Sequence, residues 1–300
     1  MIDKIFFDIT KVCNGKCKYC FTDSGGVKKQ NEFNEIEIVE ILKKLKEKGI
    51  NKISIGGGEP FLKDITKIVG ENKDLKISIT TNGTILNKNI IQMLEQNKNV
   101  KITISLDSLS NKISNKIRDG IDVDIVKRNI VELARNDKIR ERISIRTTVS
   151  KVNENEIYKI IDFCEENKIP NMKVNTTNKF GRAKENEGLI LPFSHFMNLL
   201  ENILEYCRKN KVKTNVELPI EKYLNKQQEC LCGNTSLYID SQGNVFPCAF
   251  SEGNLLIGRT KDGEILEKVL EKKFDHHNEI CMKCPVNRYK KYEKKTKAYV

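Results

Sequence analysis

The amino-acid sequence predicts an α/β fold in the form of a parallel-stranded barrel or part of one. Two observations carry this prediction. Short β-branched segments alternate with segments of helical apolar spacing from residue 4 to about residue 211, and three closely spaced cysteines directly follow the first β-branched segment. Alternating strands and helices imply parallel strands joined by right-handed crossovers. Barrels of this kind place their chemistry at the carboxyl ends of the strands, where the cysteines lie.

The predicted strands and helices follow one another in a regular order. Six segments rich in Ile, Val and Thr are predicted strands: residues 4–10, 52–58, 76–83, 100–108, 142–150 and 171–177. Four segments with helical apolar spacing are predicted helices: residues 35–49, 124–137, 156–168 and 196–211. Asn34 and Glu37 form an N-cap and N3 pair for the first helix, and Gly49 closes it.

The regular alternation ends after residue 211. Residues 212–229 have the composition of a connector, and residues 230–248 predict a hairpin with its turn at Ser241, Gln242 and Gly243. A cysteine pair at Cys281 and Cys284 precedes a basic tail. We therefore expect a barrel-like domain over residues 1–211, a connector over 212–229 and a small cysteine-rich domain over 230–300.

Composition restricts the class of protein. The 300 residues are 38% apolar and 31% charged, as in a globular protein with a sizeable core. No apolar run approaches the roughly 18 residues of a membrane span, and no signal peptide precedes the first strand. Ten cysteines without an export signal predict a cytoplasmic protein with metal or thiol chemistry. The lysines behind the net charge of +12 are spread over nearly every segment, so we expect a bias toward anionic ligands and no nucleic-acid partner.

Cys13, Cys17 and Cys20 form a C-x3-C-x2-C pattern. A structural zinc site needs four ligands, and the bacterial ferredoxin motif is tighter and has a fourth cysteine. The next cysteine, Cys164, lies on the apolar face of a predicted helix, as does Cys207, and we expect both in the core. Three thiolates on a cubane iron–sulfur cluster leave one iron without a protein ligand. The spacing alone leaves that interpretation and a zinc or redox site open.

Together with residues 53–62, the cysteine segment CNGKCKYC resembles the radical S-adenosylmethionine (SAM) superfamily. The hallmark C-x3-C-x-Φ-C has Tyr19 as its aromatic residue, and a Gly57-Gly58-Glu59-Pro60 segment ends the second strand. The resemblance covers roughly residues 1–211. It implies a 4Fe-4S cluster on the three cysteines, with SAM chelating the open iron. One electron then cleaves SAM to a 5′-deoxyadenosyl radical, which abstracts hydrogen from the substrate.

The resemblance also implies roles for individual residues. The Gly-Gly-Glu segment presents backbone groups to the SAM amino group, which suits residues without a Cβ. Asn82 contacts SAM or caps its turn. Ser105 and Asp107 correspond to positions that bind the ribose hydroxyls or the methionine carboxylate, although Asp107 could instead cap a loop. Arg146 alternates with apolar residues and faces the barrel interior, where it needs an anionic partner such as the SAM carboxylate.

Residues 230–284 resemble the SPASM or, when shorter, twitch extension of that superfamily. The motif of a cysteine followed by G-x4-C is present at Gly243 to Cys248, preceded by Cys230 or Cys232. One auxiliary 4Fe-4S cluster is implied, with the ligands Cys230, Cys248, Cys281 and Cys284. Cys232 is then a spare residue or, more speculatively, a hydrogen donor to a substrate radical. A four-cysteine zinc ribbon is the alternative. The implied fold is a partial (β/α)6 TIM-like barrel with a small C-terminal cysteine-rich auxiliary-cluster domain.

The resemblance implies a radical SAM oxidoreductase. SPASM and twitch proteins of this kind most often modify ribosomally made peptides by thioether or carbon–carbon crosslinks or by epimerisation, so we expect a peptide substrate. The alternatives are a twitch-type dehydrogenase of a small alcohol and, from another class, a non-catalytic iron–sulfur electron carrier or a zinc-binding interaction protein. The molybdopterin-pathway cyclase is a further twitch enzyme, but it ends in Gly-Arg-Arg and this chain ends in Lys-Ala-Tyr-Val.

The implied partners are a flavodoxin- or ferredoxin-type reductant and the substrate. Many peptide-modifying relatives carry an N-terminal leader-binding domain, whereas Cys13 here lies close to the first residue. We therefore expect a separate leader-peptide-binding protein, direct docking of the peptide, or a small-molecule substrate.

Overall fold

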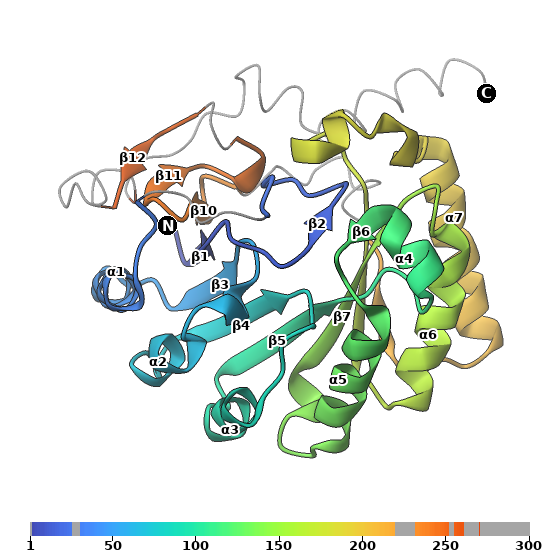
Figure 1. Cartoon of the computed structure of the whole chain (residues 1–300), viewed down its shortest axis with the longest axis horizontal. Helices are drawn as coiled ribbons and strands as arrows, with labels where there is room; N and C mark the ends of the chain where they lie inside the picture. The colour runs from blue at the N-terminus through green and yellow to red at the C-terminus, as the bar shows by residue number, and fades with distance from the viewer. Residues whose placement is uncertain (1, 26–30, 220–231, 252–254, 261–269, 271–300) are drawn as a thin grey trace.

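Six parallel strands form an open, curved sheet at the centre of the molecule (Figure 1). The computed structural model describes residues 2–25, 31–219, 232–251, 255–260 and 270. The central strands, in their order across the sheet, are β1 (Lys4–Asp8), β3 (Lys52–Gly56), β4 (Lys76–Thr81), β5 (Val100–Ser105), β7 (Ile143–Val149) and β8 (Asn171–Thr176). They are the six predicted strands, and the partial TIM-like barrel is confirmed.

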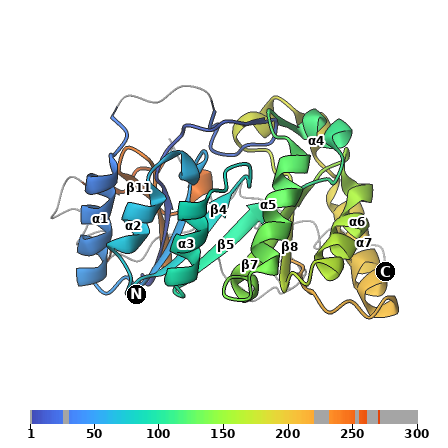
Figure 2. The ribbon, with the colours of Figure 1, turned by 60° about the horizontal axis from the view of Figure 1, so that its bottom comes forward.

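Helices cover the convex face of this sheet (Figure 2). They are α1 (Glu35–Glu47), α2 (Ile65–Gly70), α3 (Lys88–Gln96), α4 (Asn111–Ile117), α5 (Val123–Arg135), α6 (Ile157–Glu166) and α7 (Phe193–Lys209). Alternate strand residues point to opposite faces, so Ile5 and Phe7 of β1 are buried under the helices. Lys4, Phe6 and Asp8 of the same strand line the barrel interior, which we call the lumen.

The predicted cap of α1 is confirmed. The Asn34 side chain accepts hydrogen bonds from the backbone N–H groups of Ile36 and Glu37, and Glu37 accepts one from the Asn34 N–H at 2.9 Å. This reciprocal arrangement satisfies donors that the first helical turn otherwise leaves unpaired. The prediction for Cys164 is also confirmed, since its side chain is fully buried in the core.

Short 3-10 segments add to the connections between the strands and helices. They are η1 (Pro60–Leu62), η2 (Arg140–Arg142), η3 (Glu154–Glu156), η4 (Gly181–Lys184), η5 (Glu187–Leu189) and η6 (Ala249–Ser251). Among these, η1 follows the Gly-Gly-Glu segment and η4 lies against the cysteine loop. Both therefore matter for the site described below.

The sheet extends beyond the six predicted strands at both edges. Strand β9 (Asn215–Glu217) lies in the predicted connector and pairs with β8 in parallel. On the other side β10 (Ser236–Ile239) pairs with β1 in parallel, followed by β11 (Asn244–Phe246) and β12 (Gly258–Arg259). The predicted hairpin is confirmed, with Gly243 at a φ of 86° in its turn. This hairpin continues the barrel sheet, and the predicted division into domains remains a prediction.

A second, two-stranded sheet joins segments a hundred residues apart. Strand β2 (Lys16–Cys17) lies within the cysteine motif and pairs antiparallel with β6 (Arg118–Asp119), with Cys17 opposite Arg118. The Lys18 N–H extends the pairing by donating to the Ile117 carbonyl at 2.8 Å. Figure 1 shows the two strands side by side above the central sheet.

Candidate functional site

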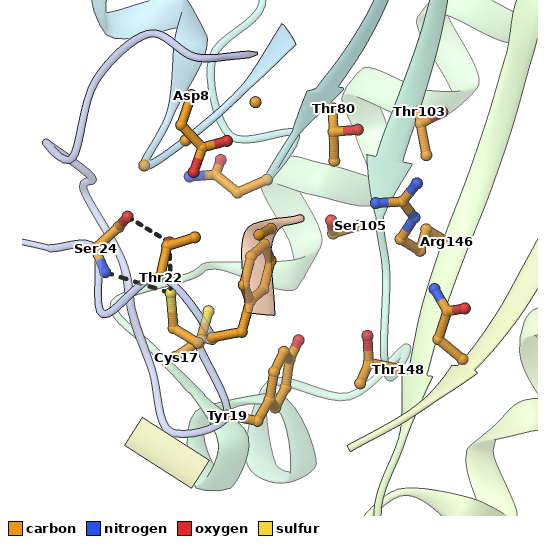
Figure 3. A pocket seen from close by; sticks show the side chains of 18 of the residues that line it. Asp8, Cys17, Tyr19, Thr22, Ser24, Thr80, Thr103, Ser105, Arg146 and Thr148 are labelled. Atoms are coloured by element: carbon orange, nitrogen blue, oxygen red, sulfur yellow. Dashed lines mark hydrogen bonds between the residues drawn. The ribbon is translucent and has the colours of Figure 1, made fainter. Parts of the chain in front are cut away.

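A cavity of about 500 Å³ occupies the lumen and is bounded by the cysteine motif. Side chains from β4, β5 and β7 line it, among them Thr80, Thr103, Ser105 and Arg146 (Figure 3). The three motif cysteines, Tyr19, and the glycines at the end of β3 line it as well. The carboxyl ends of the parallel strands thus carry the cavity and the cysteines together, as the sequence predicts.

The cysteine loop, residues 13–24, folds so that N–H groups point at sulfur. The Gly15 N–H donates to the Cys13 sulfur and the Ser24 N–H to the Cys20 sulfur, each at 3.4 Å. Hydrogen bonds of this kind to cysteine sulfurs are a means by which proteins adjust iron–sulfur clusters. Burial raises the pKa of the Cys13 thiol and of the Cys17 thiol, which favours the neutral thiols, so a bound metal would be needed to hold these groups as thiolates.

The three thiols fit a cubane cluster. All three reach the same cavity. In the described part of the chain, no three Cys, His, Asp or Glu side chains are grouped closely enough to hold a single metal ion. A cubane places its cysteine ligands further apart, because each sulfur binds a different iron. Cys13, Cys17 and Cys20 would hold such a cluster, and the cavity in front of them has room for a ligand on its fourth iron.

The glycines of the Gly-Gly-Glu segment allow two backbones to approach closely. A Cβ on Gly57 would lie 2.3 Å from the Thr10 carbonyl oxygen, and one on Gly58 would lie 1.9 Å from that of Val12. The Gly58 N–H donates to the Thr10 carbonyl at 2.7 Å. Both glycines line the cavity, which is compatible with the predicted contact with SAM. That contact remains a prediction. Because they lack a side chain, the backbone that leads into the cysteine loop can pack against the end of β3.

Glu59 and Pro60 are buried and are not among the residues that line the cavity. The Glu59 carboxylate accepts hydrogen bonds from the Thr81 hydroxyl at 2.7 Å, the Asn82 N–H at 2.7 Å and the Phe61 N–H at 3.1 Å. Burial raises its pKa, and these donors oppose that effect. In this structure Glu59 therefore fixes the end of β4, and Pro60 begins η1.

Asn82 lies between the end of β4 and the cysteine loop. Its amide donates to the Asn14 side chain at 2.7 Å and reaches the Cys13 sulfur at 3.8 Å. Its carbonyl oxygen accepts from the Thr84 N–H at 2.9 Å, which is the predicted turn cap. Asn82 also lines the cavity. Both of the roles predicted for it are compatible with this position.

Tyr19 of the cysteine loop pairs with Asp107, which follows β5. The Tyr19 hydroxyl donates to the Asp107 carboxylate, which also accepts from the Thr148 N–H at 2.7 Å. The Arg118 Nε lies 3.8 Å from the same carboxylate. Asp107 is 1% exposed and is not among the residues that line the cavity. The structure thus places its carboxylate among protein donors and outside the cavity wall, and the predicted contact with SAM remains a prediction.

Ser105 and Arg146 face the cavity, as the alternation along their strands predicts. They are register partners on β5 and β7, and Lys173 of β8 is the next residue in the same row. Figure 3 shows the Arg146 guanidinium beside Ser105 on the wall of the lumen. Its Nε is buried and has no hydrogen-bond partner within the described structure, and burial lowers its pKa. An anionic ligand would supply that partner, so the site fits a carboxylate such as that of SAM.

Segment η4 packs against the cysteine loop. Arg182 donates from Nε to the Cys17 carbonyl at 2.8 Å and from a terminal nitrogen to the Ser24 carbonyl at 2.7 Å. Its other terminal nitrogen pairs with Asp23 at 2.6 Å. Gly181, with a φ of 52°, approaches so closely that a Cβ would lie 2.2 Å from the Cys20 carbonyl oxygen.

Two of the predicted C-terminal cysteines lie in the described part of the chain. Cys248 follows β11, and its sulfur is 3.8 Å from the Ser251 hydroxyl. Its neighbours Ala249 and Phe250 line the cavity. Cys232 forms an isolated bridge with Ser236 and does not appear in the cavity wall. Cys230, Cys281 and Cys284 lie outside the described residues, so the ligand set and the donor hypothesis for Cys232 remain predictions.

Sequence reasoning missed Arg118 and Lys4 as site residues. Each lines the cavity. Lys4 opens β1 and therefore lies at the end of the lumen opposite the cysteine loop. Period-2 alternation with Asp8 was the available signal for Lys4. Arg118 lies two residues before Gly120, whose positive φ marks a turn but does not show what the turn contacts.

Comparison with known proteins identifies the family. The family description "Radical SAM superfamily" matches residues 7–164, which is more than half of the chain. The chain belongs to the radical SAM superfamily. Its membership implies the 4Fe-4S cluster and SAM for which the cavity residues are suited.

Relatives from curated sequences are GTP cyclases. A "Probable GTP 3′,8-cyclase" from Methanococcus aeolicus is 28% identical over 91% of this chain and 95% of its own length. A "GTP 3′,8-cyclase" from Aliarcobacter butzleri is 22% identical over 91% of this chain and 90% of its own length. The predicted peptide substrate gains no support from these relatives.

Solved structures share the fold. Streptococcus suis SuiB bound to precursor peptide SuiA superposes with a TM-score of 0.78 at 20% identity, over 96% of this chain and 71% of that chain. Native anSMEcpe with bound AdoMet gives 0.67 at 19% identity, over 95% and 81%. At these identities the likeness establishes the shared fold alone. Within the described residues, no helix combines the length and the apolar character that crossing a membrane requires.

Proposed function

We propose that this radical SAM enzyme abstracts hydrogen from a substrate that carries an anionic group and sits in the lumen. The supporting observation is a group of cations on the lumen wall, Lys4, Arg146 and Lys173. The bound cluster and SAM supply the 5′-deoxyadenosyl radical. The protein positions the substrate relative to that radical and excludes water from the site.

The charges of the lumen are only partly neutralised by the protein itself. Burial lowers the pKa of Lys4, and the positive charges of Lys173 and Arg146 lower it further. Lys173 pairs with Glu217 at 3.0 Å, and Asp8 accepts a hydrogen bond from the Tyr238 hydroxyl at 2.8 Å. If SAM takes Arg146 as its carboxylate partner, Lys4 and Lys173 remain for the substrate. A phosphate or carboxylate there would relieve their mutual repulsion.

A nucleoside triphosphate is the first substrate to test, because the curated relatives carry the name GTP 3′,8-cyclase. A bond between ribose C3′ and base C8 requires the removal of hydrogen from one of those carbons. We would incubate the reduced, reconstituted protein with SAM and GTP deuterated at C3′. Deuterium in the released 5′-deoxyadenosine supports a nucleotide substrate. Release of unlabelled 5′-deoxyadenosine at the rate seen without GTP would contradict it.

A ribosomally made peptide is the second candidate. Three aromatic rings gather near the cavity, where Phe250 stacks on Phe180 at 4.7 Å and meets Phe21 at 5.8 Å. Phe21 is 46% exposed, so these rings offer an apolar surface to a peptide side chain. Co-expression with candidate peptides would show a mass change of two hydrogens for a crosslink, or a changed stereocentre without a mass change for epimerisation. A small alcohol oxidised to a carbonyl also loses two hydrogens, and the same deuterium assay with labelled alcohols tests it.

We also propose one auxiliary cluster on Cys230, Cys248, Cys281 and Cys284. The support is the position of Cys248, next in sequence to residues of the cavity wall. The test is an anaerobic iron and zinc count on a variant with Cys13, Cys17 and Cys20 changed to Ala. About four irons, the content of one cubane, supports the cluster. One zinc and no iron would show a structural zinc ribbon in its place.

A flavodoxin- or ferredoxin-type reductant is the proposed electron donor. The net charge of +12 suits the docking of an acidic partner. Steady-state SAM cleavage should then lose rate steeply as salt rises when flavodoxin is the donor, and change little with dithionite. A separate leader-binding protein is proposed only if the substrate is a ribosomally made peptide. A pull-down with the leader peptide as bait would test for that protein.

A further inference from the structure

Arg118 is the residue whose placement the proposed function does not explain. It is 2% exposed, which is rare for an arginine. Strand pairing sets it opposite Cys17, a cluster ligand, and one of its terminal nitrogens donates to the Ser105 carbonyl. Residues directly opposite each other in an antiparallel pair project their side chains to the same face, and Arg118 and Cys17 both line the cavity. A buried cation is thus held against a thiolate of the SAM-binding cluster.

The charge of Arg118 is only partly balanced by Asp107. The two side chains form a buried ion pair at 3.8 Å, and the Tyr19 hydroxyl and the Thr148 N–H share the same carboxylate. Arg118 is the register partner of Cys17, whereas the Asp107 carboxylate contacts Tyr19, Thr148 and Arg118. The pair therefore presents its positive end to the sulfur.

We propose that Arg118 raises the reduction potential of the cluster held by Cys13, Cys17 and Cys20, and that Asp107 limits the size of this effect. Reduction adds one electron to the cluster, from a flavodoxin- or ferredoxin-type donor, without breaking a bond. The added negative charge is stabilised by a nearby cation in a buried site of low dielectric. Hydrogen bonds and charge near the sulfurs are among the means by which proteins set such potentials.

This inference goes beyond the proposed function, since it concerns how the cluster accepts an electron. It holds for a nucleotide and for a peptide substrate alike. Its test is an equilibrium titration without SAM turnover or substrate, so its failure and the failure of the proposed function are separate results.

The experiment is a redox titration, followed by electron paramagnetic resonance, of anaerobically reconstituted wild-type protein, Arg118→Gln, Arg118→Lys and Asp107→Asn. The signal of interest is the one that changes when SAM is added in a separate sample, which distinguishes it from an auxiliary cluster. We expect Arg118→Gln to make reduction about tenfold less favourable, a fall of about 59 mV for one electron. Arg118→Lys, which keeps the charge, should stay closer to wild type.

Asp107→Asn gives the decisive contrast, because it removes the negative charge while keeping the shape of the side chain. We expect its potential to rise. A structural role for the network would move both variants in the same direction or leave both unchanged, and either result would overturn the proposal. If Arg118→Gln does not retain the cluster, Asp107→Asn decides alone: a rise supports the proposal, and an unchanged or lower potential overturns it.

Discussion

Two arginines lie against the cysteine loop, and they do so in different ways. Arg182 is 12% exposed at its side chain, binds backbone carbonyls of the loop, and pairs with Asp23, which is 69% exposed. Arg118 is 3% exposed at its side chain, lies opposite Cys17 in the strand pairing, and pairs with Asp107, which is 1% exposed. Arg182 thus holds the backbone of the loop, whereas Arg118 lies beside one of its cysteines.

The difference follows from burial. A cation near water is screened, so Arg182 contributes mainly hydrogen-bond geometry. A buried cation keeps most of its field and becomes costly if its partner is lost. Arg118 therefore affects both stability and electrostatics, whereas Arg182 affects the order of the loop. The predictions below separate these effects, from the largest to the smallest.

Arg118→Met should cause the largest loss of stability. It leaves Asp107 as a buried carboxylate without its cation, and such a loss costs about 3–5 kcal/mol of unfolding free energy. Chemical denaturation of the cluster-free protein measures this. The matched variant Arg182→Met should lose much less. Equal losses for the two variants would show that burial does not distinguish them.

Arg182→Gln should loosen the cysteine loop without unfolding the protein. It removes charged donors to the Cys17 and Ser24 carbonyls, at about 1.5–3 kcal/mol for such a bond. Amide hydrogen exchange over residues 17–24 should become more than about tenfold faster, which corresponds to 1.4 kcal/mol of local opening. Exchange in the central strands is the internal control. Unchanged exchange in the loop would show that η4 does not hold it.

Glu59→Gln should have a moderate effect that depends on pH. The Gln amide would face the Asn82 N–H, so a buried hydrogen bond is lost at about 1–3 kcal/mol. Because burial raises the pKa of Glu59 above its ordinary 4.5, the folded state binds a proton more tightly than the unfolded state. The wild-type advantage over the variant should therefore shrink as pH rises from 4.5 to the raised pKa. Denaturation of both proteins between pH 4 and pH 8 measures it, and an advantage that grows with pH would contradict the assignment.

Asp23→Asn should have the smallest effect. The Arg182–Asp23 pair is largely exposed on the aspartate side, and such pairs contribute about 0–1 kcal/mol. Asn also tolerates the left-handed backbone at this position, where φ is 51°. Iron content and the rate of SAM cleavage should stay within about twofold of wild type, given that energy. A loss as large as that of Arg182→Gln would show that the ion pair, and not the carbonyl contacts, holds the loop.

Much of the fold followed from local patterns. The period-2 strands, the Asn34 cap and the Gly243 turn are each set by neighbouring residues, and all three predictions are confirmed. The alternation along β7 likewise placed Arg146 in the lumen. Strand β9 was missed inside the connector because its three residues pair only with a distant strand.

The cysteine motif and its family could be identified from sequence, but the contacts of the loop could not. Arg118 meets Cys17 only because β2 and β6 pair across a hundred residues of chain. Asp107 was placed on the ligand side because it ends a strand, whereas tertiary contacts with Tyr19 and Thr148 turn its carboxylate into the protein. Such long-range pairing is determined by packing, which a single sequence does not display.

The most direct test of the contrast between the two arginines is the potential of the SAM-binding cluster in Arg118→Gln and Arg182→Gln, measured side by side by anaerobic redox titration. Removal of the buried charge should lower the potential clearly. Removal of the screened charge should shift it by less than half as much, even where the loop is looser. Equal shifts in the two variants, or a larger shift in Arg182→Gln, would contradict the account.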